Sequence, residues 1–168
     1  MKGERFLEYK YTLCFIKKGE QILMLNRVKS PWMGIWNGVG GKIEKGEEPK
    51  ESVLREIMEE TGIPLSDVEY KGVVTWIVDG SRTGGMHVFL AEVPKDFEYR
   101  TPISTDEGIL DWKKISWILH PDNLGLANLK YFLPQMLEDS NTYNHKFVYE
   151  NGNVTDYSGE PMEEFVNV

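Results

Sequence analysis

Three glutamates lie close together in GGKIEKGEEPKESVLREIMEETGI, residues 40–63. On a helix, at ~100° per residue, Glu56, Glu59 and Glu60 fall within an arc of about 100°. Like charges at this spacing repel one another. Carboxylate oxygens bind Mg²⁺, an ion that also binds substrate phosphates. The spacing therefore indicates a magnesium site, and the alternative is the solvated face of an acidic surface helix.

Signals at both ends delimit this helix. Pro49 stands at a first helical position, where its missing N–H does no harm, and Gly62 follows the last periodic residue. Leu54, Ile57 and Met58 lie roughly opposite the glutamates. We therefore expect a helix over 49–61 with one apolar face in the core and one carboxylate face.

Composition and charge narrow the class of protein. The chain has 168 residues, 40% of them hydrophobic and 27% charged, which predicts one globular domain spanning 1–168. A net charge of -8 argues against a broad basic face for a nucleic-acid polymer. No stretch approaches the ~20 apolar residues of a membrane span, and we expect a cytoplasmic protein without membrane contact. Cys14, the one cysteine, lies among apolar residues and is expected to be buried.

Strand-like segments precede, separate and follow two helical segments. Strands are expected at 11–16, 22–28, 73–78, 86–93 and 109–115, and helices at 49–61 and 124–137. Pro134 implies a kink or a restart in the second helix. The turn signal ENGN predicts a C-terminal hairpin at about 146–157. This order predicts an α+β fold or an αβα sandwich, and not a regular βαβ series.

The acidic segment resembles the Nudix box, G-x5-E-x7-R-E-U-x-E-E-x-G-U with U a bulky aliphatic residue. Every fixed position is filled, by Gly41, Glu47, Arg55, Glu56, Ile57, Glu59, Glu60, Gly62 and Ile63. A diffuse Nudix-like pattern extends over about residues 8–140. The resemblance implies a Nudix-type αβα sandwich with a mixed β-sheet between helices. It also implies hydrolysis of a nucleoside diphosphate linked to another group, with Mg²⁺ as cofactor and Mn²⁺ as a substitute.

The resemblance also assigns site residues. Arg55 resembles the arginine that orients the carboxylates. Glu107, in STDEGILDW, resembles an additional metal ligand or base, and the alternative is an exposed strand-edge acid. The base that takes a proton from water stays open among Glu56, Glu59 and Glu107. The metal-binding set comprises the backbone carbonyl of Gly40 and the side chains of Glu47, Glu56, Glu59, Glu60 and Glu107.

The segment WMGIWNGVGG points to a purine substrate. Asn37 follows Trp36 as in the oxidised-purine triphosphatases of the MutT branch, where the asparagine reads the purine edge, and the alternative is a turn-forming Asn-Gly. Asn128, in LANLKYFLPQML, is a second base-reading candidate, and the alternatives are a helix cap or a solvent-facing residue. Arg27 is expected near the phosphates, or is an ordinary strand-end cation. We expect a nucleoside triphosphate, with 8-oxo-dGTP favoured, to yield a monophosphate and pyrophosphate.

Other interpretations stay open. Within the family, the substrate could instead be ADP-ribose, a dinucleoside polyphosphate, a nucleotide sugar or a capped RNA end. A non-catalytic nucleotide-binding module is a further alternative, although such modules commonly lose box glutamates. A base-stacking surface could come from Trp32, Trp36, Trp76 and Trp117, which are otherwise core residues, whereas Trp112 is expected in the core.

Overall fold

The computed structural model describes residues 9–30 and 32–162. Within them, one mixed nine-stranded sheet has the order β6-β7-β2-β1-β5-β4-β8-β9, and β3 pairs with β2. The pairs β1·β5 and β4·β8 are parallel and the other pairs are antiparallel. The strands are β1 (Tyr11–Lys18), β2 (Gln21–Arg27), β3 (Trp36–Asn37), β4 (Glu69–Val78), β5 (Arg82–Glu92), β6 (Ile103–Ser104), β7 (Gly108–Lys114), β8 (Tyr143–Glu150) and β9 (Asn153–Pro161). The helices are α2 (Pro49–Thr61), α3 (Ile115–Ile118) and α4 (Leu129–Glu138).

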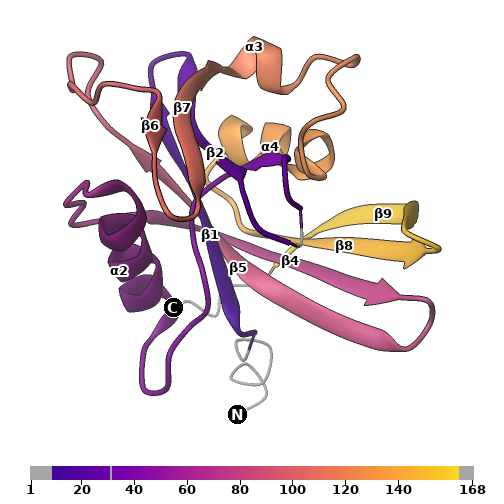
Figure 1. Cartoon of the computed structure of the whole chain (residues 1–168). Coiled ribbons are helices and arrows are strands. Elements are labelled where there is room, and N and C mark those ends of the chain that lie inside the picture. Colours follow the sequence, from indigo (N-terminus) through magenta and orange to yellow (C-terminus); the bar gives the residue numbers. More distant parts are fainter. Residues whose placement is uncertain (1–8, 31, 163–168) are drawn as a thin grey trace.

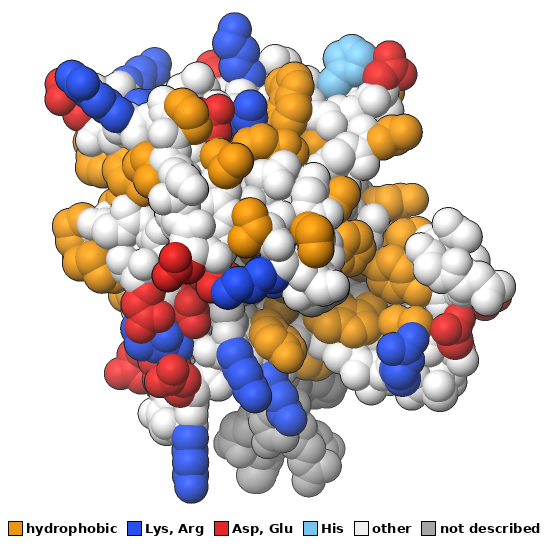
Figure 2. Space-filling model, in the orientation of Figure 1, with side chains coloured by type: hydrophobic (Ala, Val, Ile, Leu, Met, Phe, Trp, Pro, Cys, Tyr) orange, Lys and Arg blue, Asp and Glu red, His pale blue; other side chains and the backbone are white. Residues whose placement is uncertain are grey.

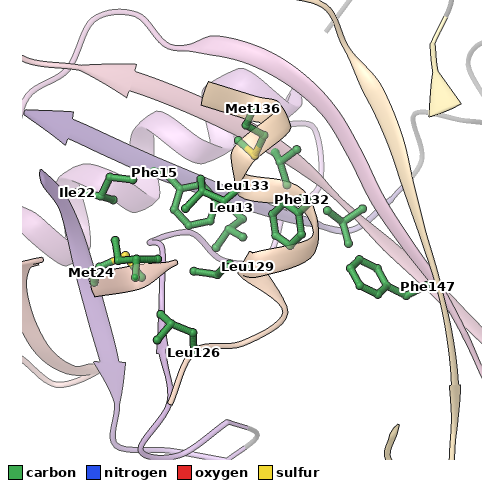
Figure 3. Packing of buried hydrophobic residues seen from close by; sticks show 13 residues of the cluster. Leu13, Phe15, Ile22, Met24, Leu126, Leu129, Phe132, Leu133, Met136 and Phe147 are labelled. Carbon is green, nitrogen blue, oxygen red and sulfur yellow. The ribbon is translucent and has the colours of Figure 1, made fainter. Parts of the chain in front are cut away.

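Two hydrophobic clusters lie on opposite faces of the sheet, because successive side chains of a strand point to opposite sides. Cys14 and Ile16 of β1 join the cluster that includes Val53 and Ile57 of α2. Leu13 and Phe15 join the cluster that includes Leu129, Phe132, Leu133 and Met136 of α4, drawn in Figure 3. Figure 1 shows the sheet running between α2 and α4. The predicted α+β sandwich with a mixed sheet between helices is confirmed.

The bounds of α2 agree with the prediction, but its buried face does not. The buried residues are Ser52, Val53, Ile57 and Thr61, whereas Met58 is 47% exposed. The prediction that Met58 packs in the core was therefore wrong. The buried face is centred on Val53 and Ile57, so that Glu56 and Glu60 border it. Glu56 and Glu60 are therefore partly buried, whereas Glu59 is exposed.

The later elements differ from the prediction in their extent. Helix α4 begins at Leu129 and not at 124, and Leu124 is 85% exposed in the preceding loop. Pro134 lies inside α4 without a restart. The hairpin expected at 146–157 is longer, since β8 and β9 cover Tyr143–Glu150 and Asn153–Pro161. The two-residue strands and α3 were not predicted, because such short elements show no hydrophobic period.

Cys14 and Trp112 were both expected in the core, and the structure buries the first fully and the second partly. Cys14 is fully buried, and burial raises the pKa of its thiol. Trp112 packs against the α2-side cluster and donates from Nε1 to the carbonyl of Tyr99 at 2.9 Å. No helix in the part of the chain that the structure describes is both long and apolar enough to cross a membrane.

Replacing Leu133 with alanine should destabilise the fold by about 2–5 kcal/mol, because this fully buried side chain of α4 would leave a cavity. Urea unfolding measures the change in the free energy of unfolding. Leu124→Ala is the matched control, and we expect it to change the free energy by less than about 0.5 kcal/mol since this leucine is exposed. Equal losses in both variants would contradict the assignment of the core.

Candidate functional site

The site begins with a glycine-containing loop that lies against β1. Val39 pairs with Cys14, and the N–H of Thr12 donates to the carbonyl of Gly41 at 2.8 Å. A Cβ atom on Gly40 would collide with the backbone of Thr12, and one on Gly41 would collide with the carboxylate of Glu56. These glycines therefore let the loop pass between β1 and α2 and leave room for a carboxylate.

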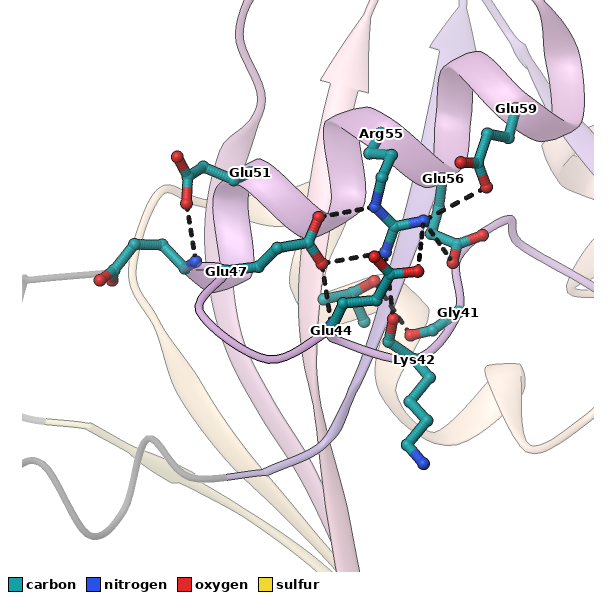
Figure 4. A network of polar contacts seen from close by, with 10 residues as sticks. Gly41, Lys42, Glu44, Glu47, Glu51, Arg55, Glu56 and Glu59 are labelled. Atoms are coloured by element: carbon teal, nitrogen blue, oxygen red, sulfur yellow. Dashed lines mark hydrogen bonds and ion pairs between the residues drawn. The ribbon is translucent and has the colours of Figure 1, made fainter.

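Arg55 of α2 holds this loop to the helix (Figure 4). Its Nε donates to Glu47 at 2.6 Å, and its Nη2 donates to the other oxygen of the same carboxylate at 2.9 Å. Its Nη1 donates to Glu56 and Glu59, each at 3.2 Å. The Arg55 guanidinium lowers the pKa of Glu47 to about 2, and the pKa of Arg55 is raised in turn. One cation thus joins three carboxylates by hydrogen bonds, and a fourth, Glu44, lies 3.8 Å from its Nη1.

Glu60 is held in an unusual environment for an acid. Burial, followed by the charge of Glu56 and a hydrogen bond with it, raises the pKa of Glu60 to about 8. A backbone hydrogen bond from Gly40 opposes this shift, and the charge of Glu107 adds to it. The Oε1 atom of Glu60 is buried and has no hydrogen-bond partner in the structure. A divalent cation would satisfy this oxygen and offset the like charges around it.

The residues present thus fit a divalent cation by their chemistry, although their side chains are not gathered around one point. Within 9–30 and 32–162, no three His, Cys, Asp or Glu side chains are gathered closely enough to hold a metal ion as they stand. Glu47, Glu56 and Glu59 all accept hydrogen bonds from Arg55. The side chain of Glu59 is 59% exposed. Figure 2 shows acidic side chains gathered on the surface over α2.

The charge of Glu107 acts on Glu60, and Arg27 lies next to Glu107 where β2 pairs with β7. Glu107 lies just before β7, and its Oε2 is 3.6 Å from Nζ of Lys29. Arg27 ends β2 and pairs with Gly108, the residue after Glu107. Besides this effect on Glu60, Glu107 makes the ion pair expected of an exposed strand-edge acid. Its role as a metal ligand or base stays a prediction. Lys29 was missed because its loop position carries no sequence signal.

The two asparagine candidates lie on segments that contact each other. Trp36 donates to the carbonyl of Gly125 at 2.8 Å and accepts from the N–H of Ala127 at 3.3 Å. Asn37 follows this contact on one segment, and Asn128 follows it on the other. The Oδ1 of Asn37 accepts from the N–H of the next residue at 2.8 Å, as in a turn-forming Asn-Gly. That bond uses the carbonyl of the Asn37 side chain and not its NH₂ group.

Asn128 stands at the N-cap of α4 but does not cap the helix through its side chain. Its Nδ2 instead donates to the hydroxyl of Tyr149 in β8. A capping asparagine normally stabilises a helix by about 1 kcal/mol. Because the side chain of Asn128 bonds to Tyr149 and not to the first turn of α4, it does not contribute this stabilisation, and the helix-cap alternative does not hold. Tyr149 was missed because the sequence does not show that the C-terminal hairpin contacts the residue at the start of α4.

Aromatic residues surround the contact between these segments. The rings of Trp36 and Trp117 meet edge to face at 6.1 Å. Nζ of Lys113 lies 4.7 Å from the Trp36 ring and 4.9 Å from the Trp117 ring, a cation–π contact that was not predicted. Trp117 stays 39% exposed, so it can offer a stacking face. Trp76 packs against the α4-side cluster and Trp32 is 48% exposed in the loop before β3.

A cavity of about 700 Å³ lies away from the carboxylates, where the start of β1 meets β4, β5 and β8. None of the predicted catalytic, metal-binding or base-reading residues lines it, although Trp76, one of the four tryptophans considered for base stacking, does. Its lining includes Tyr11, Trp76, Gly84, Lys146 and Phe147. The carboxylate cluster therefore lies outside this cavity.

Comparisons with known proteins identify several relatives of this chain. The chain is 32% identical over 117 residues to an uncharacterised Nudix hydrolase, YvcI, of Bacillus subtilis, covering 69% of this chain and 70% of that one. It is 25% identical over 160 residues to the oxidized purine nucleoside triphosphate hydrolase of Mus musculus, covering 92% and 96%. A shorter match, 35% over 79 residues, is to the NAD-capped RNA hydrolase NudC of Haemophilus influenzae, covering 46% and 29%.

A solved structure and a family model also match this chain. The crystal structure of a MutT protein from Bacillus halodurans superimposes with a TM-score of 0.73 at 27% identity, covering 90% of this chain and 97% of that one. The model of the NUDIX domain matches residues 10–139, which include the whole acidic helix and its glycine-containing loop. This chain belongs to the Nudix hydrolase family.

Proposed function

We propose that this Nudix hydrolase cleaves purine nucleoside triphosphates to a monophosphate and pyrophosphate with Mg²⁺, and that 8-oxo-dGTP or a related oxidised purine is favoured. The observation that supports this proposal is that the short segment 36–41 connects the two candidate base-reading residues with the carboxylate cluster. Trp36 and Asn37 at one end lie beside the segment of Asn128, and Gly40 and Gly41 at the other end lie against the carboxylates. The ends are at most about 18 Å apart. One extended nucleotide can therefore reach both.

The residues of the cluster have distinct parts in this reaction. Bound Mg²⁺ would supply positive charge to the phosphate oxygens and make water more acidic. Arg55 keeps the carboxylates of Glu56 and Glu59 in place. Water attacks one phosphorus of the bridge, its proton passes to a carboxylate of the cluster, and the bridging P–O bond breaks. The ion would be held by the backbone carbonyl of Gly40 and by Glu56, Glu59 and Glu60, with Glu107 adjacent and Glu47 joined through Arg55.

The base preference is supported by the asparagines and by one relative. Asn37 and Asn128 each offer amide groups that can contact a purine edge. The mouse relative, which is named for oxidised purine nucleoside triphosphates, aligns with 92% of this chain. The NudC match has a higher sequence identity than the mouse match, but it covers less than half of the chain. Because NudC is named for NAD-capped RNA, capped or NAD-linked substrates are the second candidate. Arg27 would contact the phosphates from the end of β2.

The proposal is tested by steady-state turnover of 8-oxo-dGTP, dGTP, ADP-ribose, diadenosine polyphosphates and NAD with Mg²⁺. We expect the highest kcat/KM for 8-oxo-dGTP. Asn37→Ala should lower that preference about tenfold with kcat for dGTP largely unchanged, because one base contact is lost. A wild-type preference for NAD or ADP-ribose would reject the substrate. An equal loss on all substrates in Asn37→Ala would indicate a backbone role for Asn37.

Glu60→Gln should lower kcat at least about 100-fold and remove stabilisation by Mg²⁺. In EDTA, the unfolded protein loses the Glu60 proton near pH 4.5, while the folded protein keeps it to about pH 8. The free energy of unfolding of the wild type should therefore fall between these pH values relative to Glu60→Gln. Mg²⁺ at 100 times its Kd should stabilise the wild type by about 2.7 kcal/mol and the variant by much less.

Urea unfolding at pH 5 and pH 8, with EDTA and with Mg²⁺, measures both effects. Glu98→Gln is the matched control, since Glu98 is an exposed glutamate outside the cluster. It should behave as the wild type does under all four conditions. Equal Mg²⁺ stabilisation in Glu60→Gln and wild type would remove Glu60 from the metal site.

A further inference from the structure

The side chain of Asn128 is held by the C-terminal hairpin. Its Nδ2 donates to the hydroxyl of Tyr149, a residue 21 positions away in β8. Asn128 makes no side-chain cap bond to α4, so Tyr149 is the partner that the structure gives its amide. An asparagine side chain without a partner would sample several orientations. This bond selects one of them.

Tyr149 is itself held on several sides. Its carbonyl accepts from the N–H of Asp79 at 2.9 Å, at the end of the parallel pairing of β4 with β8. Its ring stacks against Phe147 with centroids 6.0 Å apart and an interplanar angle of 24°. Burial raises the pKa of Tyr149, so its hydroxyl keeps its proton at neutral pH. The hydroxyl is therefore a neutral, fixed partner for an amide.

We propose that Tyr149 is a positioning residue that sets purine specificity by orienting the amide of Asn128. With one N–H bound to the hydroxyl, the side chain of Asn128 retains its other N–H and its carbonyl oxygen for the base. A fixed donor and acceptor can discriminate between purine edges, whereas a rotating amide accepts several. This inference rests on the proposed purine substrate and on Asn128 as a base reader.

The position of Asn128 supports this role. Trp36 accepts from the N–H of Ala127, the residue before Asn128, and Asn37 follows Trp36. The edge-to-face pair of Trp36 and Trp117 lies at the same contact. The hydroxyl of Tyr149 therefore acts on a side chain next to the proposed base site. It does so from a hairpin that contributes no carboxylate of the metal cluster.

Tyr149→Phe removes the hydroxyl and keeps the ring, so kinetics of this variant test the inference. We expect kcat/KM for 8-oxo-dGTP to fall about tenfold through KM, with kcat within about twofold of wild type. The value for dGTP should change much less, so the preference falls. Asn128→Ala should lower the preference similarly, and adding Tyr149→Phe to it should have no further effect, because both changes remove one interaction.

Tyr157→Phe is the matched control. The hydroxyl of Tyr157, in the same hairpin, contacts Nδ1 of His145 at 2.8 Å and is not bonded to Asn128. It should leave the preference unchanged even if it lowers stability. An unchanged preference in Tyr149→Phe, an equal loss for both nucleotides, or the same effect from Tyr157→Phe would each overturn the inference. Failure of the proposed function is distinct, because it would appear as a wild-type enzyme without 8-oxo-dGTP preference.

Discussion

The bidentate pairing of Arg55 with Glu47 is the interaction on which the site depends. Carboxylates at this spacing on one helix repel one another, and the backbone of α2 alone gives no reason for them to converge. Arg55 donates to Glu47 on the loop and to Glu56 and Glu59 on the helix. It therefore compensates charge and ties the loop to α2 at once. A lysine could not do so, because it lacks the planar fork of donors.

The sheet and its two clusters give this pairing a rigid frame. The loop can approach α2 only because glycine at 40 and 41 leaves room against Thr12 and Glu56. Val53 and Ile57 fix the rotation of α2 by packing on the sheet, and this rotation sets Glu60 at the border of the core. The raised pKa of Glu60 and its unpartnered oxygen at this border are typical of sites that bind a cation. The opposite cluster holds α4, and with it Asn128, beside the other end of the same loop.

Local sequence signals predicted α2 well and long-range contacts poorly. Pro49 and Gly62 mark the ends of α2, as the sequence predicted. The face of Met58 was predicted wrongly, because a helical wheel does not show where the sheet lies. The bonds of Tyr149 to Asn128 and of Lys29 to Glu107 join residues far apart in the sequence. Such contacts depend on strand order, which hydrophobic periods do not specify.

The most direct test of this account is to measure Mn²⁺ binding to Arg55→Lys. Electron paramagnetic resonance of the free ion reports the amount that is not bound. We predict that Arg55→Lys binds Mn²⁺ about 10- to 100-fold more weakly than the wild type, because the carboxylates lose their common partner. Arg82→Lys is the control, since Arg82 is exposed and pairs only loosely with Asp79 at 3.8 Å. It should bind as the wild type does. Wild-type affinity in Arg55→Lys would contradict the claim that this arginine organises the site.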